Sequence, residues 1–172
     1  MMSQLSDLVG LFEDSGIATA IRENDTLFPF IESVHVVAIC LVVGTILALD
    51  LRLLGLASVG RPVSRLATAI LPVTWGAFAI AATSGFLLFI SNATKYLANG
   101  YFDAKIILIC AAGLNMIVFH AISAKNMAKN MPQWEREARP PLPARIAGGL
   151  SILLWIAVVA CGRWIGFTMN VL

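Results

Sequence analysis

Apolar residues form four long runs in this chain, and polar residues gather between them. The runs cover about residues 28–49, 66–90, 102–123 and 146–167. A helix needs about 20 mostly apolar residues to cross the hydrocarbon core of a bilayer, and each run is long enough to do so. Because consecutive spans cross in opposite directions, the pattern predicts an all-α integral membrane protein, an antiparallel four-helix transmembrane bundle over residues 28–172.

The segment before the first run, residues 1–27, has a mixed pattern. Leu5, Leu8 and Phe12 recur at helical spacing, and acidic residues stand between them and after them. Apolar residues on one face of a short polar helix are typical of a helix that lies in the membrane interface. The segment lacks the basic start and the uninterrupted apolar core of a signal peptide. We therefore predict one or two short interfacial helices here.

Composition supports the assignment to a membrane. Of the 172 residues, 59% are hydrophobic and 13% are charged, and the mean hydropathy is +0.84. Soluble domains carry about 25% charged residues, so the composition excludes a soluble enzyme, a disordered chain and a disulfide scaffold. The net charge of +2 gives no reason to expect nucleic acid as a partner. The three cysteines lie far apart in apolar runs, and we interpret them as buried free thiols.

Basic residues are concentrated on one side of the predicted bundle. The loops after the first and third spans face the same side and hold eight of the twelve basic residues: Arg52, Arg61, Arg65, Lys125, Lys129, Arg136, Arg139 and Arg145. Seven of the ten acidic residues belong to the other side. Loops rich in lysine and arginine stay in the cytoplasm. We therefore predict a multi-pass protein of a bacterial cytoplasmic membrane, with both termini outside, in the periplasm.

Four ionisable residues interrupt the apolar runs at a similar depth near the outer side: Glu32, His35, Lys105 and Arg163. Charged groups at membrane depth are expensive and are functional candidates by default. The long side chains of Lys105 and Arg163 can also reach the lipid headgroups, so snorkelling is the competing interpretation for them. His35 is too short to snorkel far. Its imidazole is therefore either hydrogen-bonded to a neighbouring helix or a ligand.

His120, the second histidine, lies near the cytoplasmic end of the third run. From the predicted boundaries, His35 and His120 differ in depth by about eleven residues, or roughly 16 Å at about 1.5 Å per residue. One iron ion therefore cannot bind both, and each is a separate metal-ligand candidate, with an interfacial role as the alternative for His120. A haem would use one histidine with another ligand or with an open position. Gly44 and Gly85 are either helix-packing positions or the lining of a groove for a flat macrocycle.

Two parts of the sequence resemble known membrane proteins. In the first run, the resemblance rests on a histidine with a glycine nine residues later, His35 and Gly44. In the third run, it rests on an aromatic residue, a lysine three residues later and a histidine fifteen residues after that: Phe102, Lys105 and His120. This pattern resembles the HemJ-type protoporphyrinogen oxidases and the CopD copper-resistance membrane domains. The stretch FPFIESVH…DLRLLG is most similar to an uncharacterised family of short four-span bacterial membrane proteins.

The resemblance to HemJ-type proteins implies that His35 binds haem b and that Lys105 lies near a propionate or a substrate carboxylate. In a haem protein, Arg163 would be a second cation near the propionates. We therefore expect a haem b-binding membrane protein for electron transfer or redox chemistry near the outer face. A membrane quinone or a periplasmic protein would be its redox partner. Whether the protein is an enzyme stays open.

Two other functions remain open at this point. The likeness to CopD domains leaves a copper-handling membrane protein, because imidazole suits copper. The third possibility is a cofactor-free accessory or structural subunit, either within a larger membrane complex or as a homo-oligomer. In that case His35 and Lys105 are packed side chains without a ligand.

Overall fold

The structure, a computed structural model, describes residues 9–10, 12–134 and 140–169, and for residues 122–134 it describes the helix but not the side chains. These residues form helices and contain no strand. The helices are α2 (Gly16–Glu23), α3 (Leu27–Leu53), α4 (Val63–Ser91), α5 (Ala93–Leu97), α6 (Gly100–Trp134) and α7 (Leu142–Thr168). The predicted all-α class is confirmed.

Four of these helices contain segments long and apolar enough to cross a membrane: Leu27–Leu53, Val63–Ser91, Gly100–Ala121 and Leu142–Thr168. The four predicted spans are confirmed, although the helices extend beyond them. The predicted runs end where apolar residues stop, but a helix satisfies its own backbone hydrogen bonds in water as well as in lipid. For this reason α6 continues to Trp134, well past the predicted end at residue 123.

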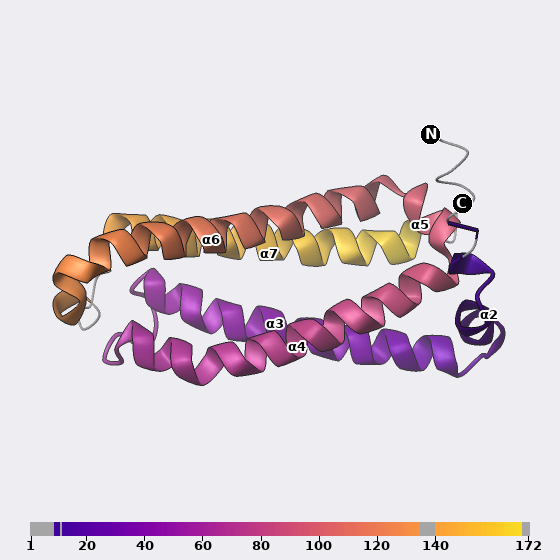
Figure 1. The fold of residues 1–172 in the computed structure, drawn as a ribbon, viewed down its shortest axis with the longest axis horizontal. Coiled ribbons are helices and arrows are strands. Elements are labelled where there is room, and N and C mark those ends of the chain that lie inside the picture. Colours follow the sequence, from indigo (N-terminus) through magenta and orange to yellow (C-terminus); the bar gives the residue numbers. More distant parts are fainter. Residues whose placement is uncertain (1–8, 11, 135–139, 170–172) are drawn as a thin grey trace.

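The long helices pack as two hairpins (Figure 1). Helix α3 packs against α4, α6 packs against α7, and α3 packs against α7 to join the hairpins. The α3–α4 turn lies at the same end of the bundle as the end of α6 and the start of α7, and α2 and α5 lie at the opposite end. This antiparallel arrangement agrees with the predicted bundle.

Polar side chains connect neighbouring helices at membrane depth. The Thr74 hydroxyl of α4 donates to the Thr45 hydroxyl of α3 at 2.9 Å. The Asn115 amide of α6 donates to the Ala147 carbonyl of α7 at 3.0 Å. Lipid tails are as apolar as leucine, so hydrogen bonds and close packing are what hold such helices together. The two bonds therefore fix the register within each hairpin.

Helix α2 lies across the end of the bundle (Figure 1), where it packs against α3 and α4. Ser15 caps it, because the serine hydroxyl accepts a hydrogen bond from the Ala18 N–H at 3.3 Å. Arg22 of α2 donates to the Ser91 carbonyl at the end of α4 at 3.3 Å. One short helix before the first span is therefore confirmed. The other segment of the prediction, with Leu5 and Leu8, lies outside the described residues.

Candidate functional site

One side chain from each long helix contributes to a cluster inside the bundle, which we call the four-helix site: His35 of α3, Ser84 of α4, Lys105 of α6 and Cys161 of α7. His35 Nδ1 lies 3.0 Å from Ser84 Oγ. Lys105 is close enough to act electrostatically on both His35 and Cys161. The predicted convergence of His35 and Lys105 at one depth therefore brings them close together in the fold.

The hydrogen bonds of Ser84 favour one tautomer of His35. The Ser84 hydroxyl donates its single hydrogen to the Ile80 carbonyl one turn earlier in α4, at 2.6 Å. With that hydrogen directed to Ile80, Ser84 Oγ is an acceptor for His35, and the matching tautomer carries the imidazole hydrogen on Nδ1. His35 also interacts with the Ala81 carbonyl, which is another acceptor. In this tautomer of the neutral imidazole, Nε2 is unprotonated and keeps a lone pair that can accept a proton or bind a metal.

Gly85 provides the space for the imidazole ring. A Cβ atom at this position would lie 2.8 Å from His35 Cε1 and 3.3 Å from Nδ1. Any other residue would force the ring to move, so the glycine holds the ring against the backbone of α4. The sequence leaves Gly85 as either a helix-packing position or the lining of a groove for a macrocycle, and in the structure its neighbour is the histidine itself.

Lys105 enters the bundle from the second turn of α6 and lies against α7. A Cβ atom at Gly162 would stand 3.7 Å from Lys105 Nζ, so the small residue leaves room for the amine. The side chain is only partly buried. A lysine beside a histidine makes this part of the bundle electropositive, which suits an anionic group of a ligand.

Three aromatic rings cover the side of the four-helix site that faces α2 and α5. Phe89 of α4 and Phe102 of α6 stack with their centroids 5.4 Å apart and their planes 9° apart. Tyr96 of α5 contacts both rings, at 6.1 Å from Phe89 and 5.4 Å from Phe102. Phe89 follows Gly85 by four residues and Phe102 precedes Lys105 by three, so both lie one helical turn from the site. We call Phe89, Tyr96 and Phe102 the aromatic cap.

The surroundings of Tyr96 change the pKa of its phenol group. Burial and, to a lesser extent, the nearby Glu32 carboxylate raise the pKa of the Tyr96 phenol above its usual value. The Glu32 side chain itself is exposed. Glu32 therefore belongs to the rim beside the aromatic cap and not to the interior cluster that its depth suggested.

Two of the predicted cofactor-binding residues lie away from the four-helix site. Arg163 is exposed, and its guanidinium stacks on the Phe167 ring at 4.6 Å. Gly44 is exposed and has open space where a Cβ would stand. Gly44 follows His35 by nine residues, which turns a helix by about 900° and puts the glycine on the opposite face of α3. Depth alone therefore misplaced Arg163, and the presence of a small residue in the same span misplaced Gly44.

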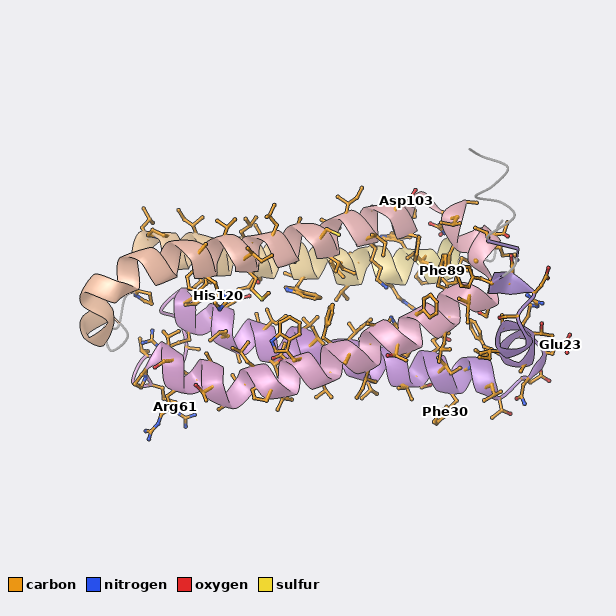
Figure 2. All side chains as sticks on the ribbon, viewed as in Figure 1. Glu23, Phe30, Arg61, Phe89, Asp103 and His120 are labelled. Carbon is orange, nitrogen blue, oxygen red and sulfur yellow. The ribbon has the colours of Figure 1, made fainter. Side chains whose placement is uncertain are left out.

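His120 is also separate from His35. Figure 2 shows His120 toward the end of the bundle that carries Arg61, whereas Phe89 and Asp103 lie toward the other end. His120 is exposed, and its Nδ1 is 2.9 Å from the Met116 carbonyl on the same helix. Fifteen residues of continuous helix separate it from Lys105, or about 22 Å. The structure thus agrees that the two histidines cannot share one metal ion.

Ser84 and Cys161 are the members of the site that sequence reasoning missed. Ser84 stands beside Gly85, which the sequence singled out, but a serine inside a span usually bonds its own helix. The apolar surroundings of Cys161 in the sequence predict a buried free thiol, whereas in the structure it is only partly buried. Across the part of the chain that the structure describes, no three His, Cys, Asp or Glu side chains come together to hold a metal ion.

Comparison with known proteins adds the family but no named relative. No curated protein and no solved structure matches the chain. The likeness to HemJ-type and CopD proteins therefore gains no support here and stays a prediction. A family model does match residues 23–168, which include all four spans and the four-helix site. The chain belongs to the family of unknown function DUF6644.

Proposed function

We propose that this protein binds haem b in the membrane and that His35 is the axial ligand. The observation that carries the proposal is the hydrogen bond between His35 Nδ1 and Ser84 Oγ at 3.0 Å. A histidine that binds a metal almost always donates its other ring N–H to a protein acceptor, which fixes the ring and strengthens the ligand. Ser84 has this role for Nδ1, which leaves Nε2 for iron.

The other residues near His35 fit the same cofactor. Gly85 seats the imidazole ring, and Lys105 offers a positive charge to a propionate. The second axial position would be open or filled by a group other than His120, because that histidine lies near the other end of the bundle. A bound haem supplies one-electron redox chemistry, and the protein supplies the ligand and the charge that tune it.

The side of the membrane on which we propose electron transfer follows from the orientation of the bundle. Arg61, Arg65 and Arg145 are exposed at the end that holds the α3–α4 turn and the start of α7. By the preference of basic loops for the cytoplasm, the four-helix site belongs to the outer half of a bacterial cytoplasmic membrane. We propose that electrons pass there between a membrane quinone and a periplasmic partner.

An absorption spectrum tests the proposal. The full-length protein is purified in detergent from cells supplied with a haem precursor, and oxidised and reduced spectra are recorded. We expect a Soret band in the wild-type protein, and we expect His35→Ala to abolish it. Protein without a Soret band, or a band that His35→Ala leaves unchanged, would show that His35 does not bind haem.

Two further variants separate haem ligation from general damage to the fold. His120→Ala removes the other histidine at an exposed position, and we expect the Soret band to remain. Ser84→Ala keeps the ligand but removes the acceptor for Nδ1. Loss of such a supporting bond weakens metal binding by about 10–100-fold, so we expect Ser84→Ala to retain less haem than wild type at limiting supply.

Metal analysis of the same samples addresses the two alternatives. Copper without haem would favour a copper-handling protein, although the described residues do not bring three ligands of the usual kinds together. Protein that is folded and free of both iron and copper would favour the accessory subunit. The apolar residues of α6 are largely exposed, and such a surface would be available to a partner subunit as well as to lipid.

A further inference from the structure

Asp50 is a buried carboxyl group that the proposed haem site does not use. It lies near the end of α3, inside the membrane-spanning segment Leu27–Leu53, and the residue is 5% exposed. One carboxyl oxygen, Oδ2, is buried and has no hydrogen-bond partner. An acidic residue in this position needs either a counter-charge or a proton.

The surroundings of Asp50 come mainly from α7. The Ser151 side chain lies close enough to the carboxyl group to act on it as a hydrogen-bonding group, and because Oδ2 has no partner, we assign Oδ1 as the oxygen that faces Ser151. Gly148 lets α7 approach closely, since a Cβ atom there would lie 3.1 Å from the Asp50 carbonyl oxygen. Helices α3 and α7 therefore pack closely beside the carboxyl group, and its Oδ2 atom is buried.

The basic residues at this end of the bundle are directed elsewhere. Arg52 is two residues after Asp50, a turn of about 200° around the helix, and its Nε donates to the Arg61 carbonyl at 2.8 Å. The side chains of Arg61, Arg65 of α4 and Arg145 of α7 are exposed, where salt screens their charge. Within the described part of the chain, no ion pair to Asp50 is formed.

The energetic comparison favours a neutral acid. Burying an ionised carboxylate without a partner is far more costly than burying a neutral polar group, for which the penalty is about 2–7 kcal/mol. We propose that Asp50 is a proton-binding site, with the proton on Oδ2 and the Ser151 hydroxyl donating to Oδ1. The proton exchanges with the end of the bundle that carries the basic loops. This inference is independent of haem binding.

Infrared spectroscopy tests the proposal directly. A protonated carboxyl group has a carbonyl stretch that is distinct from that of a carboxylate and that shifts slightly in heavy water. We expect such a band from the full-length protein in lipid at neutral pH, and we expect Asp50→Asn to remove it. The amide is similar in shape and can still accept from Ser151, so the variant keeps the neutral interface. Asp103→Asn, which changes an exposed acid on α6, is the matched control and keeps the band.

Ser151→Ala provides a second test that retains the acid. The variant removes the donor to Oδ1, so we expect the carbonyl stretch to move to a higher frequency without losing intensity. If Asp50→Asn leaves the acid region of the spectrum unchanged, or if wild type shows no protonated carboxyl group, Asp50 is ionised and the proposal is wrong. A band that Asp50→Asn removes but Ser151→Ala does not shift would overturn the assignment of the hydrogen bond.

Discussion

Replacing Gly85 with alanine tests the geometry on which the candidate site depends. The new Cβ would stand 2.8 Å from His35 Cε1 and 3.3 Å from His35 Nδ1. Carbon atoms in contact prefer about 3.5–4.0 Å, so the ring must move by roughly 0.7 Å or more. The 3.0 Å contact between Nδ1 and Ser84 Oγ is then stretched or broken.

The cost of this change can be worked out from its parts. Forcing an extra methyl group into packed surroundings costs about 1–3 kcal/mol, and losing a hydrogen bond costs about 0.5–1.5 kcal/mol. Alanine is the better helix former by about 1 kcal/mol in soluble helices, which offsets part of the loss. We expect Gly85→Ala to lower the free energy of unfolding by about 1–3 kcal/mol.

A double-mutant cycle with His35→Ala isolates the contact. Unfolding of the purified protein is followed by circular dichroism in mixed micelles of increasing denaturing-detergent content. In the His35→Ala background the ring is absent, so Gly85→Ala should no longer be destabilising. Gly44→Ala is the matched control, because it puts a methyl group into open space on the same bundle. An equal loss of stability from Gly85→Ala with and without His35 would refute the reasoning.

Two further predictions concern the cap and the α3–α7 contact. Glu32→Gln should lower the pKa of Tyr96, because it removes a negative charge that opposes ionisation of the phenol. Ultraviolet absorbance during a pH titration measures the pKa. Asp103→Asn is the control and should leave the pKa of Tyr96 unchanged. Because folding raises the pKa of Tyr96, its contribution to stability is complete below about pH 10 and is lost as the pH rises further. Gly148→Ala should destabilise the bundle by about 1–3 kcal/mol in the same unfolding assay, because its Cβ would stand 3.1 Å from both the Asp50 carbonyl oxygen and Leu53 Cβ. Gly149→Ala, with its nearest contact at 3.7 Å, should have little effect, and equal effects of the two variants would contradict the packing argument.

The depth of each ionisable residue in the membrane was predictable from the sequence. The direction in which its side chain points around the helix was not. The lengths of the apolar runs gave the four spans and placed His35 and Lys105 at similar heights. They did not show which face of α7 meets the interior, so Arg163 was grouped with His35 although it points outward. At the same height on α7, Cys161 is the residue near Lys105.

The partner of His35 was unpredictable for a related reason. Ser84 is one of several hydroxyl residues in the second span. The hydroxyl of any of them could donate a hydrogen bond to a backbone carbonyl of its own helix. Only the packing of α3 on α4 selects Ser84 as the acceptor for the imidazole. The extension of α6 beyond its apolar run has no signal in the pattern of apolar residues, because helix formation continues beyond the hydrocarbon.

The way the two hairpins meet has a consequence for how a large flat molecule would enter. The close packing between them follows α3 and α7, whereas α4 and α6 meet through the stack of Phe89 on Phe102. The Thr74–Thr45 and Asn115–Ala147 hydrogen bonds each lie within one hairpin. A rotation of one hairpin about the α3–α7 contact would therefore part the phenyl rings while the hydrogen bonds within each hairpin stay intact. The way in for a lipid-soluble guest would then be sideways from the bilayer, between α4 and α6, without passage through the aqueous phase.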